Sequence, residues 1–404
     1  MLFRSTSGGI LALVSKPSFD PNLFIDGIDS ESWKALNENW ETPMLNRTTQ
    51  GLYPPGSTFK PFIAMAILES GKLTQTSIVP APGAWSIPGT KHQYRDSVKS
   101  GHGALNLQRA ITVSSDTFFY RIGYEMGIDM VAPYLKQFGL GERTGIDLPN
   151  ENRGILPTKQ WKRERFAKGK PKEQEWHPSE MVSISIGQGY NTYTPLQMAH
   201  ATAVLANDGV SFRPHVVKEL HNHQTREITM VDPKPEAILP FKKSNFDYVK
   251  RGMEGVLRPG GTAWRVGSGL QYSMAGKTGT AQVKSIAQGK TYNAAALAEQ
   301  HRDHAWFISF APVENPKIAV AVILENGGWG ANSAPIARHL SDFYLLKILG
   351  GQGTTEDMRL PQSMSVLADE TLISSQNAKV PASLQDAFKV ARQRAPEDAS
   401  GVKP

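Results

Sequence analysis

The chain has 404 residues and a formal net charge of +7, so it can hold one large or two medium domains and can accept an acidic polymer or surface as a partner. It contains no cysteine, which excludes disulfides, thiolate catalysis and cysteine-ligated metals. No apolar run approaches the ~18 residues that a membrane helix needs. The basic residues are scattered except at 159–172, which a solvated loop explains, so we expect no nucleic-acid partner.

Apolar periodicity and turn signals divide the chain into elements, taken here in chain order. We predict a buried strand at 9–14 and an irregular connection at 15–50. Helices are predicted at 57–68, 105–113, 117–126, 196–205 and 246–257. Near the end we expect a strand at 273–283, an antiparallel hairpin of strands 306–310 and 318–324, and a closing helix at 336–346.

This order predicts an α/β fold in which a central antiparallel sheet is flanked by helices and a mostly helical subdomain is inserted. Residues 1–50 are expected to be an N-terminal remnant that supplies the first strand and a connecting segment. The main domain is expected at 51–350, with the helical subdomain at about 57–257 and the sheet with its closing helix at about 270–348. The Gly, Gln, Ser, Pro and charged residues of 351–404 predict a mobile tail.

The motif Ser57-Thr58-Phe59-Lys60 places a hydroxyl and an amine on one face at the start of a predicted helix. A serine hydroxyl needs a base to become a nucleophile, and a free lysine with a pKa near ~10.4 is protonated at neutral pH. Burial and a nearby second cation favour the neutral amine, and Lys277 is a candidate for that cation. The helix N-terminus offers N–H groups to a developing oxyanion. The alternative is a capping serine followed by a surface lysine, because the same spacing recurs at Ser400.

A second motif, Ser114-Ser115-Asp116, falls at the junction of two predicted helices. Ser114 could relay a proton between a base and a leaving amine. Asp116 could orient Lys60 or a substrate amide, or it could simply cap the second helix. An ionised Asp116 beside Lys60 would favour the charged amine, so either Lys277 offsets it or Asp116 faces elsewhere.

The third motif, Lys277-Thr278-Gly279-Thr280, lies on a predicted strand. Gly279 would let a substrate backbone approach the strand closely, and the threonine hydroxyls and the lysine charge suit a substrate carboxylate. A phosphate loop is the competing interpretation, but it requires a glycine where this chain has Gln271.

In this order the three motifs resemble the penicillin-binding and serine β-lactamase superfamily. Finer matches resemble the class B transpeptidase domains, and among them the elongation-type penicillin-binding protein 2 subfamily of Gram-negative rods. The resemblance covers roughly residues 9–350, and its matching segments are 13–22, 53–60, 94–103, 116–120, 144–149, 187–197 and 275–280.

The resemblance implies a fold of the penicillin-binding and serine β-lactamase type, and a cofactor-free D,D-transpeptidase that cross-links peptidoglycan stem peptides during lateral wall elongation. It assigns the nucleophile to Ser57, the base to Lys60, and the handling of protons and charge to Ser114 and Lys277. β-Lactams would acylate the same serine. Substrate binding falls to Asp116, Thr278, Gly279 and Thr280, and the oxyanion hole to the backbone N–H groups of Ser57 and Thr280.

Some elongation-type relatives hold a structural zinc with two Asp, a His and a Cys. Asp96 and His102 match two of these positions, but Ala81 and Ser115 occupy the other two, so we predict no metal.

The resemblance also implies a periplasmic domain of an inner-membrane-anchored protein, with the anchor absent from this chain. The implied partners are stem peptides, β-lactams, a SEDS-type glycosyltransferase and rod-shape scaffold proteins.

Three other functions stay open on the residues alone. A D,D-carboxypeptidase or a β-lactamase would hydrolyse the acyl-enzyme, and Asp147 and Glu151 lie in a plausible stretch for a deacylating base, although they look structural. A β-lactam sensor would bind without turnover.

Overall fold

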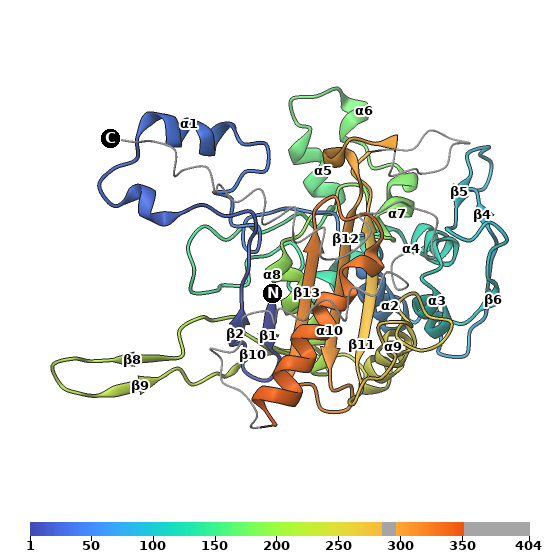
Figure 1. Ribbon diagram of the computed structural model, residues 1–404. Coiled ribbons are helices and arrows are strands. Elements are labelled where there is room, and N and C mark those ends of the chain that lie inside the picture. The colour runs from blue at the N-terminus through green and yellow to red at the C-terminus, as the bar shows by residue number, and fades with distance from the viewer. Residues whose placement is uncertain (285–295, 351–404) are drawn as a thin grey trace.

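The computed structural model describes residues 1–284 and 296–350, and its centre is a five-stranded antiparallel sheet in the order β11-β12-β13-β1-β2 (Figure 1). The strands are β1 (Leu2–Arg4), β2 (Ile10–Ala12), β11 (Ala275–Ala281), β12 (His304–Ala311) and β13 (Ile318–Leu324). The two ends of the described chain therefore meet in one sheet, and β11 forms one of its edges. The fold class predicted from the sequence is confirmed.

The hairpin β12–β13 is the best-defined part of the sheet, as its two uninterrupted apolar runs predict. Phe307 pairs with Val322 in an unbroken antiparallel register. Alternate residues enter two separate cores because successive strand side chains point to opposite faces. Trp306 and Ile308 pack with helix α8 (Pro195–Ala206), whereas Phe307 packs with helix α10 (Ala334–Asp342). Because both faces of the hairpin are covered by helices, neither strand alternates apolar with polar residues.

Helices and short hairpins fill the chain between β2 and β11. The helices are α2 (Lys60–Glu69), α3 (Leu107–Val113), α4 (Asp116–Gln137), α5 (Lys159–Arg165), α6 (Pro171–Gln174), α7 (Pro178–Ile184), α8 and α9 (Lys243–Gly255). The hairpin pairs are β3 (Val79–Ala81) with β6 (Gly103–Leu105), β4 (Ala84–Trp85) with β5 (Tyr94–Arg95), β7 (Val210–Phe212) with β10 (Pro235–Ile238), and β8 (Glu219–His221) with β9 (Ile228–Met230). Helix α2 is buried from Lys60 to Leu68, so it runs through the core and places the site beside it.

Two predictions about local structure are wrong, and one strand was missed. The connection 15–50 contains the 3₁₀ helix η1 (Pro21–Phe24) and helix α1 (Ser30–Glu38). Helix α1 buries no residue, so its sequence needs no core-facing apolar stripe. Its start is set by the Asp29 carboxylate, which accepts from two backbone N–H groups. The basic run 159–172 forms α5 and α6 rather than a loop. Strand β1 was missed because three residues are too few to show a period.

The remaining elements follow the predictions closely. The strand predicted at 9–14 is β2, and the closing helix is α10, which continues as the π-helix η6 (Phe343–Ile348). The mobile tail predicted at 351–404 lies outside the described residues, and the division into domains stays a prediction. Across 1–284 and 296–350, helix length and hydropathy give no candidate for a membrane span.

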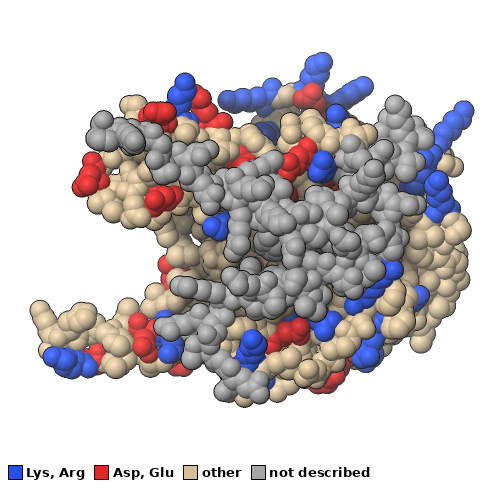
Figure 2. All heavy atoms as spheres, in the orientation of Figure 1, with Lys and Arg blue, Asp and Glu red and all other residues tan. Residues whose placement is uncertain are grey.

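Figure 2 shows lysine and arginine side chains gathered along the upper edge of the molecule, over α5 and α6. The exposed cations of α5, α6 and the segment between them are Lys159, Arg163, Arg165, Lys168, Lys170 and Lys172.

His200 makes the stability of the fold depend on pH. Its ring lies in α8 under the sheet, shares a 3.1 Å hydrogen bond with the Ser211 hydroxyl, and has a pKa that burial lowers to about 4. The unfolded chain takes up this proton near pH ~6.5, so the stabilisation is complete above that pH and is lost as the pH falls toward 4. We expect the free energy of unfolding in urea to drop by about 2 kcal/mol between pH 7 and pH 4.5 from this group.

His200→Gln should lose that part of the pH dependence, whereas the exposed His223→Gln should keep it. The same pH dependence in His200→Gln as in the wild type would contradict the assignment.

Candidate active site

Ser57 lies in a 3₁₀ turn, η2 (Gly56–Phe59), and not in the helix predicted to begin there, since α2 starts only at Lys60. Pro61 in the first turn of α2 needs no partner for its missing N–H group. Gly56 has a φ of +54°, and a Cβ at this position would lie 2.6 Å from the Thr280 carbonyl oxygen. The Ser57 side chain is half-buried, and within the described residues its hydroxyl makes no hydrogen bond. The nucleophile candidate is therefore held by its backbone.

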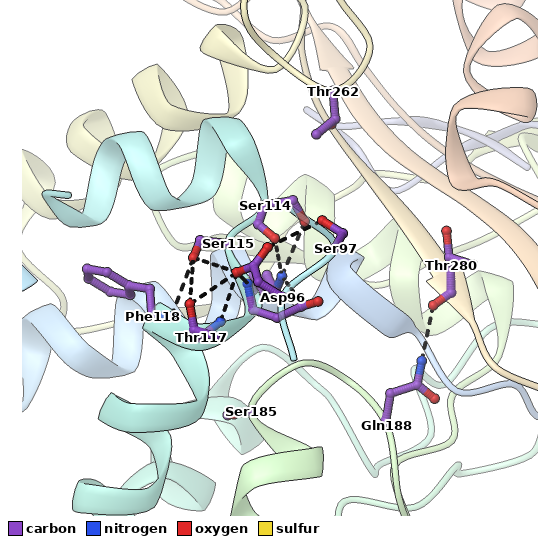
Figure 3. Close-up of polar contacts among 12 residues, drawn as sticks. Asp96, Ser97, Ser114, Ser115, Thr117, Phe118, Ser185, Gln188, Thr262 and Thr280 are labelled. Carbon is purple, nitrogen blue, oxygen red and sulfur yellow. Dashed lines mark hydrogen bonds and ion pairs between the residues drawn. The ribbon is translucent and has the colours of Figure 1, made fainter. Parts of the chain in front are cut away.

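The turn is packed directly against β11. A Cβ on Gly279 would lie 2.7 Å from Thr58 Cγ2 and 2.8 Å from the Pro55 carbonyl oxygen, so no larger residue fits there without moving the turn. Gln188 extends from the loop after α7 and donates to the Thr280 carbonyl oxygen at 3.1 Å (Figure 3). The two surfaces of the site, η2 and β11, are fixed to each other at backbone distance.

Lys60 is fully buried, and three of its contacts come from the junction of α3 and α4. Its Nζ donates to the Ser114 carbonyl oxygen at 2.7 Å, to the Ser114 hydroxyl at 3.2 Å and to Asp116 Oδ1 at 2.6 Å. The same amine lies 5.5 Å from the centroid of the Phe119 ring. Asp116 thus faces Lys60, which excludes the alternative that it faces elsewhere.

Ser114 connects the two lysines. Its hydroxyl also accepts from Lys277 Nζ at 2.8 Å, so both amines lie within hydrogen-bond distance of one oxygen. Ser114 is the residue that ends α3, with φ +60° and ψ +37°, a left-handed conformation that is uncommon for a residue with a Cβ. Ser115 then caps α4 by accepting from the Phe118 N–H group. Ending one helix and starting the next within two residues points the Ser114 hydroxyl into the site.

Lys277 lies on β11 and is completely buried. Its pKa is well below the usual lysine value, chiefly because burial disfavours the charged amine and also because Lys60 is close by, while the Asp116 carboxylate opposes the shift. Its amine also donates to the Thr278 carbonyl oxygen at 3.0 Å. The second cation expected from the sequence is therefore an amine inclined to be neutral.

The two threonines of the third motif are already engaged. Thr278 Oγ1 lies 2.7 Å from Thr262 Oγ1, and Thr280 Oγ1 accepts from the Gly330 N–H group at 3.0 Å. Sequence reasoning missed Thr262 and Gln188 as neighbours of β11. Thr262 follows a pair of glycines and carries no motif, whereas Gln188 stood in a matched segment without an assigned role.

The residues at the zinc position of some relatives do not fit a metal. The Asp96 carboxylate accepts hydrogen bonds from the Ser115 hydroxyl at 3.0 Å and from His102 Nε2 at 3.1 Å, and Ala81 has no ligand atom in its side chain. In the part of the chain that the structure describes, no three His, Cys, Asp or Glu side chains come together as metal ligands.

The structure thus brings Lys60, Ser114, Asp116 and Lys277 into one hydrogen-bonded group. Ser57 lies on the segment that carries Lys60, but its hydroxyl is not bonded to that group. A hydroxyl on a rigid turn, beside two buried amines joined through a second hydroxyl, can perform acyl transfer by a serine nucleophile.

Comparisons with known proteins agree with this chemistry. The sequence matches the penicillin binding protein transpeptidase domain over residues 1–342. It is 43% identical over 341 residues to the peptidoglycan D,D-transpeptidase MrdA of Escherichia coli K12, covering 84% of this chain and 53% of that protein. With MrdA of Acinetobacter baumannii the identity is 44% over 345 residues, covering 84% and 49%. The chain therefore spans about half the length of these curated relatives.

Solved structures give the same result. The structure of Pseudomonas aeruginosa PBP2 in complex with WCK 5153 superposes with a TM-score of 0.74 at 39% identity, covering 85% of this chain and 73% of that one. The Helicobacter pylori complex of PBP2 with MreC gives 0.74 at 32% identity, covering 86% and 60%. The match over most of the chain, on a fold that carries the serine and lysine motifs, shows that this chain belongs to the penicillin-binding protein transpeptidase family, in the group that includes MrdA and PBP2.

Proposed function

We propose that this chain is the catalytic domain of a serine D,D-transpeptidase that cross-links peptidoglycan stem peptides during wall elongation and is acylated by β-lactams. The observation that carries the proposal is the Ser114 hydroxyl, which lies 3.2 Å from Lys60 Nζ and 2.8 Å from Lys277 Nζ beside the turn that holds Ser57. Two amines of unequal basicity joined by a hydroxyl form a proton relay, which a serine nucleophile without a histidine needs.

The relay accounts for the conflict between Asp116 and the base. The Asp116 carboxylate lies 2.6 Å from Lys60 Nζ, and a carboxylate this close favours the charged form of an amine, so the proposed base needs a partner that takes its proton. In the free protein the lowered pKa of Lys277 opposes that transfer, but the carboxylate of a substrate bound beside β11 raises the pKa of Lys277, which can then take the proton through the Ser114 hydroxyl. Lys60 is then neutral and can accept the proton of the Ser57 hydroxyl.

Acylation forms the bond between Ser57 Oγ and the carbonyl carbon of the donor D-Ala-D-Ala and breaks the peptide C–N bond. The leaving amine of D-Ala takes a proton from the relay through Ser114. In the second half-reaction an acceptor amine attacks the ester, the proton of that amine enters the relay, and Ser57 regains its hydroxyl. Protons balance over the two steps, and no co-reactant is required.

Substrate placement follows from the position of β11 at the edge of the sheet. An edge strand has backbone groups that are not paired with another strand, and an extended peptide can add along them. We assign the oxyanion hole to the N–H groups of Ser57 and Thr280, which belong to the turn and the strand that pack together. We assign the terminal carboxylate to Thr278 and Thr280, and we assign to Asp116 the orientation of Lys60.

The two candidate deacylating carboxylates favour a transpeptidase over a β-lactamase. Asp147 accepts from the N–H groups of Val216 and Val217 at 2.8 and 2.9 Å. Glu151 is buried and accepts from Thr144 and Gly145. Both carboxylates hold loops together through backbone donors, so neither is available to activate a water on the acyl-enzyme.

The setting of the whole protein is also a proposal. MrdA relatives and the PBP2 complex with MreC support a periplasmic domain of an inner-membrane protein that works with a rod-shape scaffold protein. A SEDS-type glycosyltransferase is the polymerase partner that we propose for the full-length protein.

A fluorescent penicillin tests the nucleophile. We expect one long-lived covalent adduct, which mass spectrometry of peptides locates on Ser57. Ser57→Ala should abolish labelling, while Ser70→Ala, at the other end of α2, should label like the wild type. Labelling that persists in Ser57→Ala would refute the assignment, and rapid loss of the adduct from the wild type would indicate a β-lactamase.

Ser114→Gly separates the relay from the fold. Glycine adopts the left-handed conformation of this residue without strain, which offsets part of the loss of the two hydrogen bonds of the hydroxyl, so the variant should still fold and melt cooperatively. Because the hydroxyl that joins the two amines is lost, the acylation rate should fall by roughly 10² to 10⁴-fold. Wild-type acylation by a stable Ser114→Gly protein would exclude the relay.

Gly279→Ala tests the packing of the turn on β11. The added methyl group meets Thr58 and Pro55 at under 3 Å, so it should displace Ser57 and lower the acylation rate at least tenfold, which corresponds to about 1.4 kcal/mol. The control is Gly9→Ala, where a Cβ has ordinary contacts at 3.5 and 3.6 Å. Equal acylation rates in the two variants would show that this packing does not hold the nucleophile.

A further inference from the structure

We propose that Asp96 is a positioning residue of this active site: its buried carboxylate fixes the first turn of α4, and that turn sets Ser114 and Asp116 against Lys60. The proposal rests on the proposed function, since the contacts that Asp96 fixes are those of the proposed base. Within the described residues Asp96 makes no hydrogen bond to Ser57 or to β11, and in this proposal it has no part in the transfer of protons.

One oxygen of Asp96 gathers the donors at the start of α4 (Figure 3). Oδ2 accepts from the Asp116 N–H group at 2.8 Å, the Thr117 N–H group at 3.1 Å and the Ser115 hydroxyl at 3.0 Å. The Thr117 hydroxyl lies 3.1 Å from Oδ2 and 2.7 Å from the Pro82 carbonyl oxygen, so its single proton is shared between the two acceptors. The first N–H groups of a helix have no partner within the helix, and a negative charge there is stabilised by the helix dipole. The side chain of Asp96 is completely buried, so water does not compete for these bonds.

The other oxygen closes the segment that carries Asp96. Oδ1 accepts from the Ser97 hydroxyl and the Val98 N–H group at 3.3 Å each, and from His102 Nε2 at 3.1 Å. Burial alone would raise the pKa of Asp96, but the Thr117 N–H group and the charge of Lys60 hold it below its usual value. Asp96 therefore stays ionised and acts only as an acceptor, shared among these donors.

The link to the site is a chain of adjacent bonds. Asp116 donates its N–H group to Asp96 and accepts from Lys60 with its carboxylate. Ser114, two residues earlier, gives Lys60 both its carbonyl and its hydroxyl oxygen. The left-handed backbone of Ser114 needs support from the surrounding structure, and the first turn of α4, which Asp96 holds, supplies that support. Any shift of this turn moves two of the partners of Lys60 together.

The residues at the positions of the relatives' zinc ligands are joined by hydrogen bonds instead. At the position where some relatives have a cysteine, the Ser115 hydroxyl donates to Asp96. His102 makes a direct hydrogen bond to Asp96 through Nε2. Ala81 takes part only with its carbonyl oxygen, which accepts from the His102 N–H group at 2.8 Å. Hydrogen bonds thus provide the cross-link that a zinc ion would otherwise provide.

The test compares the Asp96→Asn and His102→Gln variants of the 404-residue chain. Asparagine keeps the shape but loses the charge and one acceptor, so we expect a tenfold to hundredfold lower rate constant for acylation at saturating fluorescent penicillin. The dissociation constant of the preceding non-covalent complex should stay within twofold. His102→Gln loses a contact on the Oδ1 side only and should lower the melting temperature with a rate constant within twofold of wild type.

Hydrogen exchange gives a readout that needs no acylation. The amides of Asp116 and Thr117 should exchange faster in Asp96→Asn and remain protected in His102→Gln. If Asp96→Asn does not fold, Thr117→Val removes the hydroxyl that lies between Asp96 Oδ2 and the Pro82 carbonyl oxygen and should lower the acylation rate constant severalfold.

Three results would overturn the proposal: a wild-type rate constant in Asp96→Asn, equal losses of rate in Asp96→Asn and His102→Gln, or a melting temperature that a zinc chelator lowers. Failure of the wild type to label would instead overturn the proposed function, and the exchange of the two amides would still decide the role of Asp96.

Discussion

The amines of Lys60 and Lys277 both bond to the Ser114 hydroxyl in the interior of this protein. The surrounding structure stabilises two amines that would repel each other if both were charged. Two positive charges at this distance repel each other, and burial removes the water that would screen the repulsion. The pair is tolerated because the amines differ: Lys60 has the Asp116 carboxylate at 2.6 Å, whereas burial and its neighbour hold the pKa of Lys277 well below the usual value. Because the pKa of Lys277 is lowered, that amine adds no second full positive charge to the interior.

Three segments have to meet to form this site, and each is held in place by a different kind of contact. The turn of Ser57 is positioned by backbone packing against β11, which Gly56 and Gly279 allow. The junction at 114–116 is positioned by helix ends and, in our proposal, by Asp96. Strand β11 is positioned by its continuous pairing with β12 from Ala275 to Ala281. None of the three relies on long exposed side chains, so the site is as rigid as the core that surrounds it.

The chemistry of the site could be predicted from the sequence because motif residues carry it, but the geometry could not. The spacing of Ser57 and Lys60 predicted a shared helix face, whereas the structure places the serine on a 3₁₀ turn, because the contact with β11 lies far away in the sequence. The hairpin of β12 and β13 was predicted well, since two uninterrupted apolar runs allow few alternatives. Helix α1 and the role of Asp96 were missed, because one depends on a single cap and the other on hydrogen bonds between distant segments.

The pairing of Phe3 with Ala319 has a consequence for how the protein is made. A ribosome delivers the chain from its N-terminus, so β1 appears long before the strand it pairs with. The relay shares this delay, because Ser114 and Lys277 are 163 residues apart along the chain. Contacts this distant in sequence form slowly, since loop closure precedes any gain from them. In the proposed mechanism, Ser57 therefore lacks its relay until β11 has joined the sheet.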